Sequence, residues 1–155
     1  MIRRCGDEMS ERDDIQTLID EMYALISGPG GRVRDWERQR QLFMPGTRMI
    51  RTRIDGQGRP EPEVLRLEDY GANYEQLMGG RDFFEVEIRN TIQVFGRVAQ
   101  VFSAYEAFAD QARQQRLKRG VNVIQFYRFD EGWKIIAMAW DDERPGLSLD
   151  ETGPR

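Results

Sequence analysis

The sequence predicts an α+β fold, in which N-terminal helices pack into a cone-shaped, curved antiparallel sheet. Three observations predict it: helical periodicity is confined to the first half of the chain, four long strand-like segments fill residues 83–140, and short polar turns join them. Strands joined by short turns run antiparallel, and strands this long must twist and curl. The concave side of such a sheet is the place where amphipathic helices can bury their apolar sides.

Two helices are expected before the first strand. The first begins near Ser10, whose spacing from Asp13 is that of a capping box, and it ends at Gly28-Pro29. Its apolar residues recur at three- and four-residue steps: Ile15, Leu18, Ile19, Met22, Leu25 and Ile26. A second, short helix is capped by Asp35 and ends at Pro45-Gly46; its apolar side is Val33, Trp36, Leu42 and Phe43.

A hairpin and a third helix follow. Residues 47–54 alternate in polarity as a strand does, residues 55–58 form a turn, and residues 63–66 pair back. The third helix carries Leu67, Tyr70, Tyr74, Leu77 and Met78 and ends at Gly79-Gly80. The long strands are then expected at 83–95, 98–108, 121–129 and 133–140.

Length and composition indicate one domain with an ordered core of about residues 11–142 and polar tails at both ends. The chain has 155 residues, enough to bury a core, and a net charge of −4 with acids and bases interspersed. A nucleic-acid partner would favour a basic face, so we expect none. No segment approaches the roughly 20 apolar residues of a membrane span, and residues 1–8 lack the apolar centre of a signal peptide.

Cys5 is the only cysteine, and the chain has no His. An internal disulfide is therefore impossible, which fits a reducing, cytoplasmic location. Without His, a metal site would need clustered acids, and no acidic cluster has metal-binding spacing. We therefore expect neither a metal nor a cofactor.

Four segments resemble the nuclear-transport-factor-2-like superfamily, and more closely its bacterial SnoaL-like branch. They are residues 35–46, 98–106, 119–125 and 132–141, and the resemblance extends over roughly residues 14–142. It implies a cystatin-like α+β barrel, often dimerised through the convex sheet face. The superfamily includes ketosteroid isomerases, scytalone dehydratase, polyketide cyclases and non-catalytic binders. The resemblance therefore implies binding of a small apolar or polyketide- or steroid-like molecule in the cone.

An enzyme on such a fold would need a carboxylate as its base, because the chain offers no His. Glu106 is the best candidate: strict alternation places it on one face with Gln100 and Phe102, where apolar surroundings would raise its pKa. Its other interpretation is a strand-end carboxylate that pairs with Arg or faces water. Asp141 is another candidate, and Tyr105 or Tyr23 would polarise a carbonyl. Glu85 and Glu87 are candidates as well, but they alternate with Val86 and Ile88, a pattern typical of solvent-facing carboxylates.

Candidate ligand-binding residues are aromatic, or they carry a polar tip within an apolar strand or helix. Core packing explains the aromatic residues equally well, and a convex position explains the amides equally well. The candidates are Tyr23, Trp36, Phe43, Tyr70, Tyr74, Gln100, Phe102, Tyr105, Asn122 and Gln125.

Self-association is expected from the last strand. If Lys134 faces water, alternation puts Ile136, Met138 and Trp140 on the same convex face, where a second subunit would cover them. Three functions stay open. The absence of an acid–base pair favours a small-molecule binding protein without catalysis; the others are a carboxylate-based isomerase, dehydratase or cyclase, and a dimeric protein-interaction module.

Overall fold

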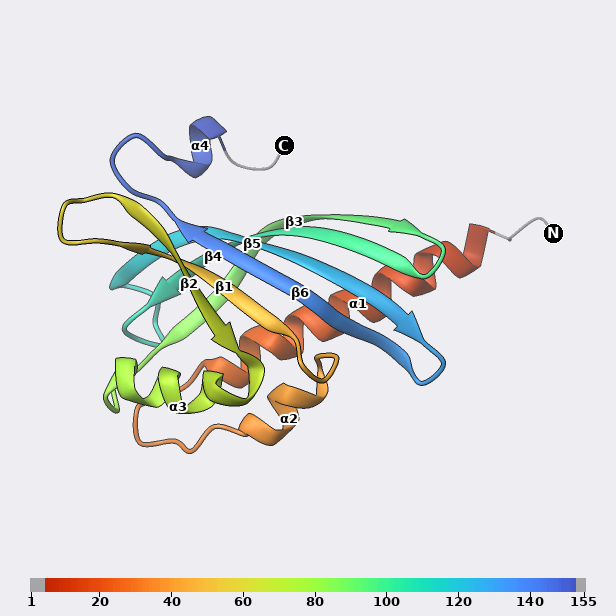
Figure 1. The fold of residues 1–155 in the computed structure, drawn as a ribbon, viewed down its shortest axis with the longest axis horizontal. Helices are drawn as coiled ribbons and strands as arrows, with labels where there is room; N and C mark the ends of the chain where they lie inside the picture. The colour runs from red at the N-terminus through yellow and green to blue at the C-terminus, as the bar shows by residue number, and fades with distance from the viewer. Residues whose placement is uncertain (1–4, 153–155) are drawn as a thin grey trace.

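The structure, a computed structural model, describes residues 5–152 and the side chains of residues 11–150. Two N-terminal helices precede a hairpin, a third helix follows it, and four long strands complete the sheet (Figure 1). The elements are α1 (Cys5–Ile26), α2 (Trp36–Gln41), β1 (Arg48–Ile54), β2 (Pro60–Arg66), α3 (Leu67–Met78), β3 (Phe84–Phe95), β4 (Val98–Phe108), β5 (Arg116–Phe129), β6 (Gly132–Asp142) and α4 (Leu149–Thr152).

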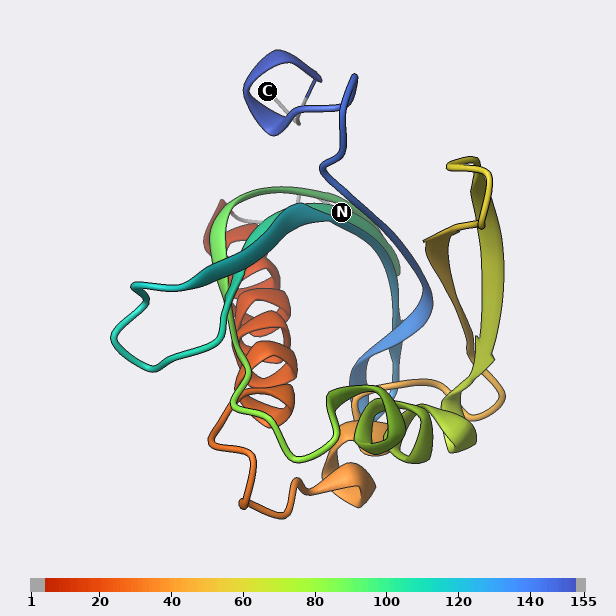
Figure 2. The same ribbon diagram turned by 90° about the vertical axis from the view of Figure 1, so that its left-hand side faces the viewer.

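The six strands form one curved sheet in the order β2-β1-β6-β5-β4-β3. The predicted α+β fold is confirmed, with one difference: the sheet is mixed, because β1 runs parallel to β6, and Met49 pairs with Met138. All other neighbouring strands are antiparallel. Figure 2 shows the sheet curling around α1, while α2 and α3 lie along the open side of the curl.

The core lies between α1 and the concave face of the sheet. Ile15, Ile19 and Met22 of α1 are buried there, as their three- and four-residue spacing predicts. Val101 and Ile124 of the central strands meet them and are fully buried. Burial of side chains of this size stabilises the fold by about 1.5–3 kcal/mol each, so this packing fixes α1 inside the curl.

The helices on the open side pack through a close contact between α2 and α3. Trp36 lies against Gly71, where an added Cβ would come within 2.7 Å of the indole ring. The same ring packs against Tyr74 in a tilted arrangement, with ring centroids 5.0 Å apart and an angle of 57° between the ring planes. Only glycine lets the two helices approach this closely, so Gly71 fixes how α3 sits across the opening.

Two of the three register shifts in the sheet, those in β3 and β6, decide which side chains of these strands face the concave side. Glu87 pairs with Tyr105 but Arg89 pairs with Ala104, so Ile88 is an extra residue in β3. In β6, Ile136 is extra in the same way, because Gln125 pairs with Ala137 and Phe126 pairs with Ile135. An extra residue reverses the inward and outward alternation beyond it.

The bulge at Ile136 makes the expected convex row wrong. Met138 and Trp140 lie beyond it and line the concave cavity, whereas Ile136 borders a hollow on the other face. Lys134 donates a hydrogen bond to the Gln41 carbonyl at 2.7 Å. The three apolar residues therefore do not form one exposed surface.

Ordered structure reaches further than expected at both ends. The first helix begins at Cys5, so Ser10 lies inside α1 instead of capping it. After β6 the chain continues into α4, where Leu149 is buried and Glu143 pairs with Arg119 at 2.7 Å. Residues 1–4 and 153–155 of the expected tails lie outside the described residues. Within residues 5–152, no helix combines the length and the hydrophobicity that crossing a membrane requires.

Candidate functional site

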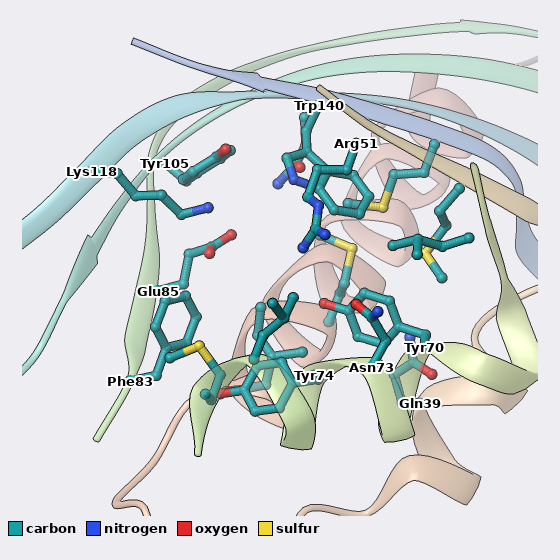
Figure 3. A pocket seen from close by; sticks show the side chains of 18 of the residues that line it. Gln39, Arg51, Tyr70, Asn73, Tyr74, Phe83, Glu85, Tyr105, Lys118 and Trp140 are labelled. Atoms are coloured by element: carbon teal, nitrogen blue, oxygen red, sulfur yellow. The ribbon is translucent and has the colours of Figure 1, made fainter. Parts of the chain in front are cut away.

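A cavity of about 290 Å³ lies between the concave face of the sheet and α3. This volume is at the lower end of the range of about 300–1,000 Å³ usual for small-molecule pockets. Helices and strands from both halves of the chain contribute to its walls (Figure 3). Most of its lining is apolar: Met22, Ile26, Phe43, Met49, Leu65, Leu77, Met78, Phe83, Leu117, Met138 and Trp140.

Glu85 projects into this cavity from the start of β3 (Figure 3). Its backbone is tied to the end of α1: the Ser27 hydroxyl accepts from the Glu85 N–H at 2.9 Å, and Gly28 exchanges two backbone hydrogen bonds with Phe83. These contacts fix the direction of the first strand residues. The Glu85 residue is only 8% exposed, and that exposure faces the cavity.

Burial raises the pKa of the Glu85 carboxyl from 4.5 to about 7. The nearby Lys118 ammonium opposes this increase, Asp142 adds to it, and the Asn122 amide stabilises the ionised form. The carboxyl can therefore exist as acid or as carboxylate near neutral pH, which is what a group that takes up and releases protons requires.

Beside Glu85, three side chains from different strands are joined through one carboxylate. The Tyr105 hydroxyl donates to Asp142, and Lys118 Nζ donates to the other oxygen of Asp142 at 3.2 Å. Burial, followed by the charge of Asp142, raises the pKa of Tyr105. Gly120 stands opposite Tyr105, and an added Cβ would lie 2.5 Å from the tyrosine oxygen. Because the Tyr105 hydroxyl already donates its hydrogen bond to Asp142, it is not free to polarise a ligand carbonyl.

Asn122 is held at the cavity wall by a chain of buried hydrogen bonds. Its amide donates to the Tyr23 hydroxyl at 3.0 Å, Tyr23 and Ser103 are 2.7 Å apart, and Ser103 donates to Glu87. The Tyr23 proton must therefore point to Ser103, since the Ser103 proton is used by Glu87. The three hydrogen bonds join Asn122 to Glu87 through Tyr23 and Ser103, so the Asn122 amide has a fixed orientation.

The opposite end of the cavity carries a second polar group of residues: Gln39 from α2, Arg51 from β1, and Tyr70 and Asn73 from α3. Arg51 donates to Glu63 through Nε, at 3.1 Å, and through Nη2. Figure 3 shows the Arg51 guanidinium and the Tyr70 ring projecting towards the centre of the cavity, across from Glu85. The cavity therefore combines an apolar middle with two polar ends.

Five of the expected ligand-binding residues line this cavity: Phe43, Tyr70, Tyr74, Tyr105 and Asn122. Two more lie immediately behind its wall. Tyr23 orients Asn122, as described above, and Trp36 packs behind Tyr70 and Tyr74. Whether any of them contacts a ligand stays a prediction.

The other three, Gln100, Phe102 and Gln125, are on the opposite face of the sheet and border hollows there. The alternation predicted along β4 is present, and its inward residues are Val101, Ser103 and Tyr105, so Tyr105 is the one β4 candidate that faces the cavity. Sequence alternation separates two faces without saying which one is concave.

Glu106 lies on this outward face too and does not line the cavity. Its carboxylate is 3.8 Å from Arg116 and 3.9 Å from Arg119, which matches the alternative interpretation of a carboxylate paired with Arg. Asp141 pairs with Arg144 at 2.5 Å. Neither carboxylate can reach a molecule in the cavity, so Glu85 replaces Glu106 as the candidate base.

Sequence reasoning assigned Glu85 to solvent and did not identify Gln39, Arg51, Asn73 or Lys118 as site residues. No local signal marks them, because they come from separate elements and meet only when the sheet curls. Among the described side chains, no three His, Cys, Asp or Glu residues come together as a metal site would require.

Comparisons with known proteins show the fold alone. No family model matches the chain, and no curated protein matches it significantly. Solved structures do match: a Mycobacterium tuberculosis protein of unknown function has a TM-score of 0.72 and 17% identity, over 95% of this chain and 82% of that one. A nuclear-transport-factor-2-like protein with a cystatin-like fold from Novosphingobium aromaticivorans has a TM-score of 0.68 and 15% identity, over 86% and 82%.

A third match is a member of the same structural family from Streptomyces avermitilis, named as a candidate dehydratase. Its TM-score is 0.63 and its identity 14%, over 86% of this chain and 97% of that one. Identities this low support a shared fold without a shared reaction. The chain thus has the nuclear-transport-factor-2-like, cystatin-like fold that the sequence segments suggested.

Proposed function

We propose that the protein binds a small, mostly apolar organic molecule in the cavity between the sheet and α3. The observation that carries the proposal is the cavity itself: apolar side chains line its middle, and a few polar groups stand at its two ends. Its volume of about 290 Å³ favours a molecule of one or two rings over larger polyketide- or steroid-like compounds. Placement in the SnoaL-like branch is part of this proposal and is supported by the four sequence segments.

Methionine methyl groups give a direct test, because Met22, Met49, Met78 and Met138 line the cavity and Met44 does not. Protein labelled with ¹³C at the methionine methyls is titrated with 2-tetralone and indole and followed by NMR. We expect the four lining resonances to shift while Met44 stays in place. Equal shifts at Met44, or no shift at saturating probe, would contradict the proposal.

A pair of tryptophan substitutions, one at the rim of the cavity and one outside it, gives a matched test and control. Leu77 lines the cavity and is 46% exposed, so Leu77→Trp is expected to reduce probe binding without unfolding the protein. Val64, on β2, is 54% exposed and does not line the cavity. Val64→Trp should therefore bind the probes as the parent protein does.

Proton transfer is a second candidate function, favoured by the position of Glu85 and its pKa of about 7. The Glu85 carboxylate would remove a proton from the carbon beside a ligand carbonyl, and the Tyr70 hydroxyl would donate to the oxygen as negative charge develops. This is chemistry that a carboxylate-based isomerase, dehydratase or cyclase requires.

Exchange of the α-protons of 2-tetralone into deuterated water tests the chemistry without knowledge of the natural substrate. We expect the protein to accelerate exchange, and Glu85→Gln to reduce the acceleration by about 100-fold or more, the usual contribution of a general base. Glu106→Gln, which removes a carboxylate from the other face, is the matched control and should exchange normally. Acceleration that survives Glu85→Gln would refute a role for this residue.

A further inference from the structure

The end of the cavity opposite Glu85 is rich in hydrogen-bond donors that have no acceptor among the described residues. Arg51 uses Nε and Nη2 for Glu63, and among the described residues its Nη1 has no partner. Figure 3 shows this guanidinium directed into the cavity and not along the outer surface. One N–H edge of the guanidinium is therefore available to a ligand.

Gln39 is a second polar side chain at this end of the cavity that has unused hydrogen-bonding atoms. It is only 3% exposed, and within the described part of the chain its side-chain amide forms no hydrogen bond. Both amide atoms nevertheless remain accessible from the cavity, which Gln39 lines. The amide therefore offers an unused donor and an unused acceptor at the cavity surface, where a bound molecule can pair with them.

Tyr70 and Asn73 add donors at the same end. The Tyr70 ring packs against Trp36 and Tyr74, which leaves its hydroxyl at the cavity, and no described residue bonds to that hydroxyl. Burial raises the pKa of the Tyr70 hydroxyl, the nearby charge of Glu85 adds to this increase, and the charge of Arg51 opposes it. The hydroxyl thus lies between the two polar ends.

Most of the charged side chains that line the cavity are cations. Arg51, Arg81 and Lys118 line the cavity as cations, and Glu85 is its only acidic lining residue among the described side chains. Glu63 and Asp142 already pair with Arg51 and Lys118, but the N–H groups that these cations leave unused favour a ligand that supplies acceptor oxygens. The planar fork of a guanidinium matches a carboxylate, which can accept from two donors at once.

We propose that the ligand of this cavity is a small carboxylic acid, whose carboxylate is bound by Arg51, Gln39 and Tyr70 and whose hydrocarbon part extends over the methionines towards Glu85. This rests on the proposed binding function and specifies the class of molecule bound. The carboxylate end of the ligand fixes its orientation, so that a carbon atom, and not a second charge, faces Glu85.

Matched pairs of probes test the proposal. Phenylacetate is compared with phenylacetamide, and cyclohexanecarboxylate with its primary amide, by titration of the methionine methyl resonances at about pH 6. We expect each acid to bind at least about tenfold more tightly than its amide, the difference of a single charge-assisted hydrogen bond. Arg51→Met should remove this preference, and Gln39→Leu should weaken the acid more than the amide.

The control is Arg53→Met, because Arg53 makes the same kind of pair, with Glu61, on the same hairpin but outside the cavity. It should keep the preference for acids. Amides that bind as tightly as acids, or a preference that survives Arg51→Met, would overturn the carboxylate proposal while leaving small-molecule binding intact. If neither acids nor amides shift the methionines that line the cavity, the carboxylate proposal and the proposed binding function both fail.

Discussion

The buried carboxyl of Glu85 makes a quantitative prediction about stability. Its pKa is about 7 in the folded protein and 4.5 for an unperturbed side chain. Below pH 4.5 the group is protonated in both folded and unfolded protein, so it adds no pH dependence. Between pH 4.5 and about 7 the unfolded chain releases the proton and the folded protein keeps it, so the free energy of unfolding falls as pH rises.

The size of the effect follows from the difference of 2.5 between 7 and 4.5. Each pKa unit corresponds to about 1.4 kcal/mol, so the ionisable carboxyl lowers stability by about 3 kcal/mol at pH 8 relative to pH 4. Glu85→Gln removes the titration and keeps the shape of the side chain. The variant should therefore match the parent protein near pH 4 and exceed it by about 3 kcal/mol at pH 8.

Urea denaturation of both proteins at several pH values from 4 to 8 measures this difference. Other titrating groups affect parent and variant alike and largely cancel in the comparison. The charged or titratable groups around the same cavity are Arg51, Tyr70, Tyr74, Arg81, Tyr105, Lys118 and Asp142. A stability difference that stays constant across this range, or a variant that is less stable at pH 8, would refute the inference that burial disfavours the ionised form of Glu85.

Three further variants test the surroundings of the site. Gly120→Ala should destabilise the protein by about 1–3 kcal/mol, because its methyl group would displace Tyr105; thermal unfolding measures this, and a neutral effect would contradict the packing. Tyr23→Phe leaves the buried Asn122 N–H without its acceptor and removes the donor to Ser103, so it should cost about 1–3 kcal/mol in urea denaturation, where an unchanged midpoint would argue against the buried chain of hydrogen bonds. Self-association through the convex face stays a proposal, and if it occurs, Phe102→Glu should convert a dimer to a monomer in sedimentation, whereas a monomeric parent protein would rule it out.

Local patterns are sufficient to predict the first three helices and the six strands in their order, but not α4. The spacing of Ile15, Ile19 and Met22 identifies the buried side of α1, and the turns at Gly96 and Gly132 separate the long strands. Such signals act over a few residues and depend on periodicity and backbone freedom. The pairing of β1 with β6 is not predictable in this way. Met49 and Met138 are far apart in the sequence, so no local pattern relates the two strands.

Site residues were predicted less well because their prediction depends on the parity of each strand. Alternation along β4 places Gln100, Phe102 and Glu106 on one face of the sheet. It does not indicate whether that face is concave or convex. In β3 the apolar Val86 and Ile88 suggest the inward face, whereas the carboxylate of Glu85 is the group that points into the cavity. Polar residues of a ligand cavity break the usual rule that inward residues are apolar.

The two bulges account for how such an exception is tolerated. Ahead of Ile88, β3 turns Glu85 and Glu87 inward; beyond it, the strand turns Ile92 into the core. One strand thus provides polar groups for the cavity and an apolar wall for α1. The bulge at Ile136 has the matching effect on β6, since Ile135 faces the core ahead of it and Met138 faces the cavity beyond it. A regular sheet of the same sequence would have placed either the core residues or the cavity residues in solvent, so the bulges are what allow both to face inward.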